Sequence, residues 1–551
     1  FERIKYIFFN SDKSKLSQEE LTLLEKEYKS FCRNGALLSF DEKQKLRELD
    51  ETLALKSLDF GKKILKDTNT YFLHIQELKN LKGLPNSSLS YAKQLALRKK
   101  LSGWVFTLDA PSYIPFITYS EIRSLRKRIF DAYSMRGFNN NNNNTVEIIK
   151  NIVSLRKERS KLLGYKSHAD FILEERMSLS EKNTINFINN LYDKSFPFAK
   201  KEWEKLAFFA KKNLGINHLE KWDIAYATEK YKKSLLKIDE LELKKYFSLD
   251  KVLTGLFKII NKLYGLSFIL NNEIDRYTES VIVYEIYDEK NNFKSLLYVD
   301  LYPRKGKREG AWMTSYLGQK ENQRPHISVV CNFPSPDKSK KSLINFQELK
   351  TLFHEFGHAL HGILSNTKYE NLSGTNVLWD FVELPSQIME NWCYEEEALN
   401  IFARHYKTNN QIPKNLIRKI KKIAQFQQGI QTIKQLGYAS LDLSFHTKNI
   451  DKIKNIKEHE DQVLRKFQFI KPSKNHCLSC SFSHIFQGGY SAGYYSYKWA
   501  EVLDADAFEV FLENGIFNRQ TAKKFEKTIL SKGGTEHPMK LYKDFRGKEP
   551  D

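Results

Sequence analysis

The chain has 551 residues, of which 41% are hydrophobic and 28% are charged. This length supports a large core and suggests two to four domains, or one large helical body with a cleft. The sequence contains no apolar run of the roughly 18 residues that a transmembrane helix needs, so we expect none.

The formal net charge of +22 could indicate a surface for nucleic acid or for an anionic membrane. The lysines, however, are mostly single or paired, and no basic tract is interleaved with aromatic residues. We therefore interpret the charge as solvated helix surface and expect no binding to nucleic acid or membrane.

The five cysteines are scattered and odd in number, which favours a reducing compartment. Cys477 and Cys480 form a single C-x-x-C pair, and a zinc ribbon would need a second pair. We expect free loop thiols there, with a redox role as the alternative. The chain begins at Phe1 rather than at Met, which we interpret as a processed or trimmed end, so a targeting peptide could have been removed.

Residues 1 to about 280 are predicted to be almost entirely helical. Leucine and isoleucine recur at helical spacing in segments such as 46–53 and 148–155. The six asparagines of 139–144 separate two helical segments, and we expect a disordered loop without function there.

Between residues 281 and 333 the pattern changes to β-branched and aromatic residues. Segments 281–286, 295–302 and 326–333 are predicted to be strands of a small sheet. An edge strand at the end of this region could hold an extended peptide through main-chain hydrogen bonds. An ordinary structural hairpin is the alternative.

Segment 349–364 contains an H-E-x-x-H motif, His354-Glu355-Phe356-Gly357-His358. Its apolar residues follow helical spacing, and His354, His358 and His361 fall on the opposite side of the predicted helix, where they would line a polar cavity. Two imidazoles four residues apart can bind one Zn²⁺, and the intervening Glu355 can reach a bound water. A chance pair of surface histidines is the alternative.

A closed catalytic zinc site needs a third protein ligand. Glu383 is one candidate, because it lies between Val382 and Leu384, where an unpaired buried carboxylate would be costly. Glu390 lies on the same face if the segment is helical. The spacing favours neither, and whichever does not ligate could hold an imidazole in place.

Segment 475–495 interrupts the predicted C-terminal helices. Gly488 and Gly489 mark a flexible loop that lacks the Lys-Ser/Thr of a phosphate-binding loop. His484 and the tyrosines that follow could donate hydrogen bonds to the oxyanion of a tetrahedral intermediate. Packing is the alternative role for these aromatic residues.

Five segments, 354–361, 372–377, 380–387, 390–392 and 482–499, resemble the thimet oligopeptidase family of zinc metallopeptidases, and most of all its bacterial and organellar oligopeptidase A branch. The resemblance selects Glu383 as third ligand, with His354 and His358, of one Zn²⁺, and makes Glu355 the general base. It implies outer-shell roles for Glu390 and Asp380. By the same resemblance, His484 and Tyr497 are donors to the transition state. Substrate contacts are expected from Tyr490, Tyr494, Gly488 and Gly489.

The resemblance also implies a mostly α fold, a two-lobed helical body around a deep cleft, with a small β-sheet beside the zinc helix. We expect a helical lobe over 1–280, from which an N-terminal part of the family domain is absent, and a catalytic region over 281–551 that ends like the family's C-terminus.

The predicted function is a zinc-dependent endopeptidase that hydrolyses short oligopeptides through a Glu-activated, zinc-bound water. We expect oligopeptide substrates as its partners, a monomeric chain, and a location in the cytoplasm, or in a mitochondrion or plastid if a targeting peptide was removed. The alternatives are an organellar peptidase that processes presequences and an inactive peptide-binding scaffold.

Overall fold

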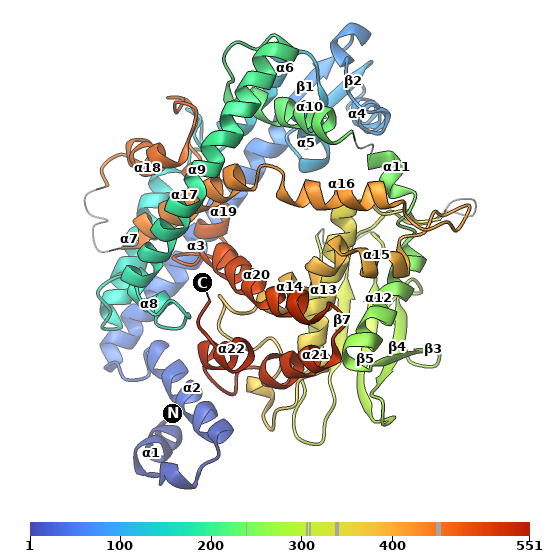
Figure 1. The fold of residues 1–551 in the computed structure, drawn as a ribbon. Coiled ribbons are helices and arrows are strands. Elements are labelled where there is room, and N and C mark those ends of the chain that lie inside the picture. Colours follow the sequence, from blue (N-terminus) through green and yellow to red (C-terminus); the bar gives the residue numbers. More distant parts are fainter. Residues whose placement is uncertain (238–239, 305–306, 308–309, 337–340, 448–452, 551) are drawn as a thin grey trace. The chain divides into compact units, whose positions relative to one another are not determined.

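The structure is a computed structural model that describes residues 1–237, 240–304, 307, 310–336, 341–447 and 453–550. The chain divides into two compact units, each assembled from separate segments (Figure 1). Unit 1 comprises residues 1–36, 238–425 and 496–551, and unit 2 comprises 37–237 and 426–495. This division differs from the linear boundary near residue 280 that the sequence suggested, because contacts between distant segments decide which parts of a chain are compact.

Unit 1 contains most of the short helices and the larger sheet. Its α-helices are α1 (Glu2–Asn10), α2 (Gln18–Arg33), α11 (Glu240–Lys244), α12 (Leu249–Tyr264), α13 (Phe346–Ile363), α14 (Leu384–Glu390), α15 (Glu396–Phe402), α16 (Lys414–Gln425), α20 (Ser496–Asn514), α21 (Arg519–Phe525) and α22 (Pro538–Arg546). Its shorter helical turns are η1 (Lys13–Lys15), η4 (Glu370–Leu372), η5 (Asn391–Tyr394) and η9 (Glu526–Leu530).

The sheet of unit 1 has the order β3-β4-β5-β7-β6. Its strands are β3 (Ser267–Asn271), β4 (Ile282–Tyr287), β5 (Phe293–Asp300), β6 (Trp312–Leu317) and β7 (His326–Val330). Strands β5 and β7 pair in parallel, and the other neighbours are antiparallel. Helix α13 packs against β6 and β7, and Gly362 fits closely over Ile327, where an added Cβ would lie 2.7 Å from the Ile327 Cδ1 atom. The sheet therefore lies beside the H-E-x-x-H helix, as predicted.

The three predicted strands correspond to β4, β5 and β7, but the predicted place of the edge is wrong. Strand β7 lies between β5 and β6, so the edge on this side is β6, which the sequence did not reveal. A strand that completes both of its hydrogen-bonded ladders has no free edge to offer a peptide. A peptide that extends the sheet on this side would therefore pair with β6.

Unit 2 is built around long helices. Its α-helices are α3 (Phe40–Thr70), α4 (Asn86–Arg98), α5 (Ala110–Tyr119), α6 (Arg123–Ser134), α7 (Val146–Leu162), α8 (His168–Leu173), α9 (Glu181–Leu214), α10 (Ile224–Leu236), α17 (Gln428–His446), α18 (Ile456–Leu464) and α19 (Ser483–Phe486). The remaining elements are η2 (Leu78–Leu81), η3 (Lys221–Asp223), η7 (Arg465–Phe467), η8 (Ser479–Ser481) and the antiparallel pair β1 (Phe72–Ile75) and β2 (Trp104–Thr107). Helix α17 lies along α9, and α3 lies along α7 (Figure 1).

The asparagine run forms an ordered loop, not the disordered one that we expected. Asp67 of α3 is almost fully buried, and its carboxylate accepts hydrogen bonds from the Gly137 backbone N–H and from the side-chain amides of Asn139, Asn141 and Asn143. A buried carboxylate is costly without such donors. The asparagines therefore supply what Asp67 needs.

The chain is mostly helical, as predicted. Within the part of the chain that the structure describes, no helix combines the length and the apolar character that a bilayer-spanning segment requires.

Candidate metal centre

Helix α13 carries the H-E-x-x-H motif. It begins with a capping box, in which the Asn345 side chain accepts from the Glu348 backbone N–H and the Glu348 side chain accepts from the Asn345 backbone N–H. This arrangement satisfies two of the N–H groups that a helix start leaves open. The apolar stripe predicted for the helix is buried throughout: Leu349, Leu352, Phe353, Phe356, Leu360, Ile363 and Leu364.

Of the three histidines predicted to line a cavity, His361 does not. It is fully buried, and within the described chain neither of its ring nitrogens has a hydrogen-bond partner. Burial lowers the pKa of His361 to about 3, so the ring is neutral. The segment after the helix folds back on this turn, where Gly374 approaches the His361 carbonyl oxygen and Gly362. This cover removes His361 from the surface that His354 and His358 share.

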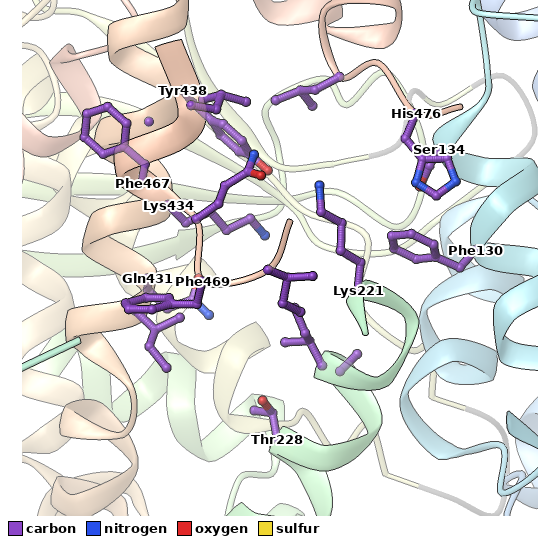
Figure 2. Close-up of a pocket in the computed structure, with 18 of the residues that line it drawn as sticks. Phe130, Ser134, Lys221, Thr228, Gln431, Lys434, Tyr438, Phe467, Phe469 and His476 are labelled. Carbon is purple, nitrogen blue, oxygen red and sulfur yellow. The ribbon is translucent and has the colours of Figure 1, made fainter. Parts of the chain in front are cut away.

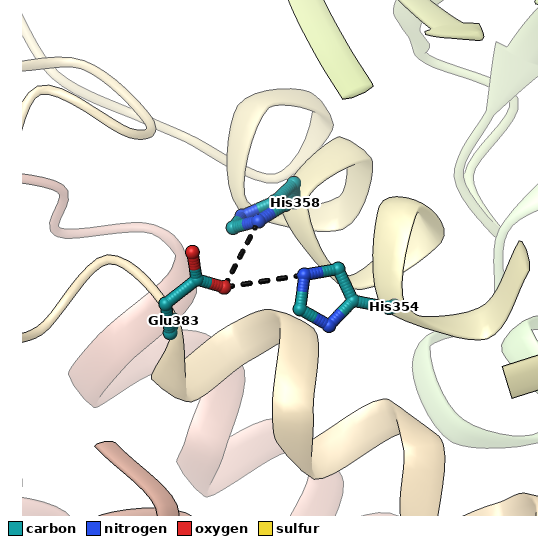
Figure 3. Close-up of side chains that lie close together, drawn as sticks. All are labelled: His354, His358 and Glu383. Atoms are coloured by element: carbon teal, nitrogen blue, oxygen red, sulfur yellow. Dashed lines mark ion pairs between the residues drawn. The ribbon is translucent and has the colours of Figure 1, made fainter. Parts of the chain in front are cut away.

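Glu383 reaches both motif histidines from the start of α14. Its Oε2 atom lies 3.2 Å from the Nε2 atom of His354 and 3.3 Å from the Nε2 atom of His358 (Figure 3). Ser386 donates to the same carboxylate oxygen at 2.7 Å. The carboxylate is therefore held in place by a neighbour in its own helix.

Gly357 makes this approach possible. An added Cβ at Gly357 would lie 2.1 Å from the Pro385 carbonyl oxygen and 2.5 Å from the Ser386 Cα atom. The backbones of α13 and α14 thus touch directly between His354 and His358. Close contact of this kind places Glu383 within reach of both imidazoles.

Glu390 contacts the other nitrogen of His354. Its Oε1 atom is 2.8 Å from His354 Nδ1, and its Oε2 atom is 2.7 Å from the Lys350 Nζ atom. A carboxylate in this position fixes the ring orientation and leaves Nε2 free to ligate. Burial would lower the pKa of His354, but its hydrogen bonds to Glu383 and Glu390 raise that pKa to about 10.

Asp380 is fully buried in the segment that precedes Glu383. It lies near His537, where it opposes the effect of burial, which lowers the pKa of that histidine. The Nδ1 atom of His358 is buried and has no hydrogen-bond partner within the described residues. The outer-shell role expected for Asp380 stays a prediction.

Glu355 lies beside the cluster, is 6% exposed, and follows His354 directly on the helix. Burial raises the pKa of its carboxyl above the usual value, while the neighbouring His354 and His358 oppose this shift. A carboxylate with a raised pKa is a stronger base than an exposed one, which suits it to accept a proton.

His354, His358 and Glu383 form the only cluster of its kind among the described residues, with one ligand atom from each within 4.8 Å of the others. Ligands at the distances typical of a tetrahedral zinc ion stand roughly 3.4 Å apart. The separations of 3.2 and 3.3 Å between Glu383 and the histidines agree with that value. The negative potential that raises the His354 pKa would equally favour a cation, so these residues fit a divalent metal.

Comparison with known proteins identifies the family. The model of Peptidase family M3 matches residues 116–551, which is most of the chain. The chain belongs to peptidase family M3.

Individual relatives agree with this assignment. This M3 peptidase is 37% identical to Oligopeptidase A of Escherichia coli (strain K12), over 95% of this chain and 78% of the relative. It is 36% identical to an Arabidopsis thaliana protein named Organellar oligopeptidase A, chloroplastic/mitochondrial, over 100% of this chain and 72% of the relative. The solved structure of PZ peptidase A with an inhibitor shares the fold, with a TM-score of 0.56 at 16% identity over 100% of this chain and 80% of that one.

The glycine- and tyrosine-rich loop of this M3 peptidase belongs to unit 2. His484 lies on α19 with its ring centroid 6.1 Å from that of Tyr490 and 5.8 Å from that of Tyr494. Gly488 and Gly489 are exposed between them. Burial lowers the pKa of His484 and raises that of Tyr494, so both are neutral donors near neutral pH.

Tyr497 falls in the first turn of α20, which belongs to unit 1. Helix α20 packs against α14, the helix that begins just after Glu383. The structure thus brings His484, Tyr490 and Tyr494 together in one unit and puts Tyr497 in the unit of the metal cluster.

The sequence analysis did not identify the residues that anchor this loop. The Asp442 carboxylate accepts from the backbone N–H groups of Ala492 at 2.8 Å and Tyr494 at 2.9 Å, and it lies 3.0 Å from His446 Nδ1. Arg156 lies 2.8 Å from the other nitrogen of His446 and donates to the Ile485 carbonyl oxygen at 2.7 Å. The signal was present, because Asp442 is a carboxylate between two leucines, the same pattern that drew attention to Glu383.

Proposed function

We propose that this M3 peptidase is a zinc-dependent endopeptidase that hydrolyses short oligopeptides. The observation that carries the proposal is the convergence of His354 Nε2, His358 Nε2 and Glu383 Oε2 on one point beside Glu355. When bound there, zinc would supply a Lewis acid that polarises a carbonyl and lowers the pKa of a water molecule.

Glu355 acts as the base. It takes a proton from the water that attacks the scissile carbonyl and delivers it to the leaving amine. The burial that raises its pKa supports this role, because the group must accept the proton and then release it. Glu390 holds His354 through Nδ1 and is itself neutralised by Lys350.

The remaining predicted residues would act on the substrate. His484 and Tyr497 donate to the oxyanion, and Tyr490, Tyr494 and the Gly488-Gly489 pair contact the peptide. The neutral state of the His484 and Tyr494 side chains supports donor roles. The free edge of β6 would pair with the peptide backbone.

The preference for short peptides is inferred from the relatives, which are named oligopeptidases. A deep cleft that excludes folded proteins would explain this preference. The same names do not favour a presequence-processing enzyme or an inactive scaffold. A monomer in the cytoplasm or in an organelle is part of the proposal, and one relative is named as an organellar protein.

The test is hydrolysis of a quenched fluorescent peptide of ten or so residues. We expect a chelator to abolish turnover and added zinc to restore it. Glu355→Gln should lower kcat by about 10²–10⁴ without loss of bound zinc. Glu397→Gln, an exposed carboxylate on α15, is the matched control and should leave kcat unchanged. Full activity of Glu355→Gln, or of the metal-free enzyme, would show that the proposed mechanism is wrong.

A further inference from the structure

Unit 2 contains a cavity of about 580 Å³ that lies outside the metal centre. All the residues that line it belong to unit 2, from α5, α6, α9, η3, α10, α17, α18 and the segment after α18 (Figure 2). Its volume falls in the range of about 300–1,000 Å³ that is typical of sites for small molecules.

The walls of the cavity are largely apolar and include several aromatic rings. Trp203 stacks on Phe469 with ring centroids 5.3 Å apart and an angle of 10° between the planes. Tyr133 stacks on Tyr113 at 3.9 Å and 7°. Flat apolar walls of this kind suit a planar or slender apolar body.

Two lysines reach into this apolar space. Lys221 of η3 and Lys434 of α17 extend into the cavity from different elements (Figure 2). Within the described chain neither ammonium group has a hydrogen-bond or ion-pair partner, although Lys434 lies 5.8 Å from the centroid of the Tyr438 ring. Lys221 is partly buried and Lys434 is exposed, so both ammonium groups are open to a solute in the cavity. Burial lowers the pKa of both groups, and the nearby carboxylates of Glu460 and Asp461 partly oppose this shift at Lys221.

The other charged side chains at the cavity, and its histidine, already have partners. Lys457 pairs with Asp461, and the imidazole of His476 is 3.0 Å from Asp131. The Glu460 carboxylate accepts from the Leu478 and Ser479 backbone N–H groups, from the Ser479 hydroxyl and from the Cys477 thiol. The uncompensated charge of the cavity is therefore positive.

We propose that this cavity binds an amphipathic anion, whose single anionic group meets Lys221 and Lys434 while its apolar body lies against the aromatic walls. The C-terminal carboxylate of a peptide with an apolar last residue and a free aromatic or aliphatic acid share this chemistry. The inference does not depend on the metal centre or on peptidase activity.

Binding is tested with anilinonaphthalene sulfonate on the full chain carrying Glu355→Gln, so that no peptide is cleaved. Adding Lys221→Gln or Lys434→Gln should weaken binding at least about tenfold, as expected for loss of a charge-assisted hydrogen bond. Lys200→Gln, an exposed lysine on α9, is the matched control and should not change the affinity. N-phenylnaphthylamine, which has the same body without the sulfonate, should bind all variants alike.

Two further readouts tie the probe to the cavity. Trp203→Phe should reduce energy transfer from tryptophan to the bound probe, because Trp203 forms part of the wall. The melting temperature of each lysine variant should be unchanged or higher, because an uncompensated charge is removed. Equal affinity of the two cavity variants and the Lys200→Gln control, or no binding of the probe, would overturn the proposal.

Competition identifies the source of the anion. Displacement of the probe by a decapeptide with a free C-terminus, and much less by its C-terminal amide, would assign the cavity to peptide ends. Displacement by naphthalene acetate, but by neither peptide, would assign it to free acids. If none of these displaces the probe, the proposal is wrong.

Discussion

The His354-His358-Glu383 cluster of unit 1 and the cavity of unit 2 differ in whether their charged groups have partners. At the cluster, each carboxylate has partners: Glu390 contacts Lys350 and His354, and Glu383 contacts His354 and His358. In the part of the cavity that the structure describes, no carboxylate pairs directly with Lys221 or Lys434. The comparison teaches that the cluster needs only a cation to complete it, whereas the cavity needs an anion.

The two regions also differ in how the chain assembles them. The cluster is drawn from residues 354–383, and the cavity from residues 113–481. We therefore expect single substitutions in the cluster to act strongly and locally. The predictions below test this difference, from the largest expected effect to the smallest.

Glu383→Gln should have the largest effect. Loss of a charged ligand should lower zinc affinity by more than the roughly 100-fold seen for outer-shell partners, and peptide hydrolysis should fall with it. Zinc content and competition with a chromophoric chelator measure the change. The control variant Glu397→Gln should keep the wild-type zinc affinity. Unchanged zinc binding by Glu383→Gln would show that Glu383 is not a ligand.

Gly357→Ala should destabilise unit 1 by about 3 kcal/mol, because its Cβ would collide with the backbone of α14. Urea denaturation gives the free energy of unfolding. Gly489→Ala is the control, since an added Cβ there meets nothing within 4 Å. Similar stability of both variants would contradict the close approach of α13 and α14.

Glu390→Gln should weaken zinc binding by about 10–100-fold and leave it measurable. The amide keeps the size of the carboxylate but no longer neutralises Lys350 or favours the required tautomer of His354. Comparing its zinc affinity with that of Glu383→Gln shows which carboxylate binds zinc directly and which one holds His354 in place. If Glu390→Gln loses more zinc than Glu383→Gln, their roles must be exchanged.

Asp442→Asn should destabilise the loop of unit 2 by about 1–2 kcal/mol, because one amide oxygen replaces two carboxylate oxygens that accept backbone N–H groups. Hydrogen exchange at Ala492 and Tyr494 should accelerate, while zinc affinity in unit 1 stays constant. A change in zinc affinity without faster exchange would show that the two regions are not independent in this respect.

Asp504→Asn should have the smallest effect, and one that depends on pH. Burial raises the pKa of Asp504 to about 8, although Asn391 donates to it. A raised carboxyl pKa means that the folded state holds the proton, so this contribution to stability is complete below the unfolded pKa and is lost as pH rises towards 8.

Between about pH 6 and about pH 7, the unfolding free energy of the wild type should therefore fall by up to about 1.4 kcal/mol relative to that of Asp504→Asn. Denaturation at about pH 6 and about pH 7 measures the difference. Parallel pH profiles for the two proteins would show that Asp504 does not titrate in this range.

The sequence by itself determined the part of the site that lies on one helix. Helical periodicity puts His354 and His358 on the same side and the apolar stripe of α13 on the other, because both depend on residues three and four apart. It also predicted a mostly helical chain and three strands of the sheet. The sequence did not predict the short strands β3 and β6, because the contacts that stabilise them come from neighbouring strands.

Only the tertiary structure shows which carboxylates contact the two motif histidines. The sequence spacing did not distinguish Glu383 from Glu390 as the third zinc ligand, and only the family resemblance favoured Glu383. In the structure, α13 and α14 are in contact at Gly357 and Pro385. The Glu383 carboxylate then lies against the Nε2 atoms of His354 and His358, and the Glu390 carboxylate lies against Nδ1 of His354.

The burial of His361, the anchor at Asp442 and the two cavity lysines likewise depend on segments far apart in sequence. Local patterns report which face of an element is apolar. They do not report which distant segment covers that face, and this cover decides whether a charged group is paired, buried or left open to a ligand.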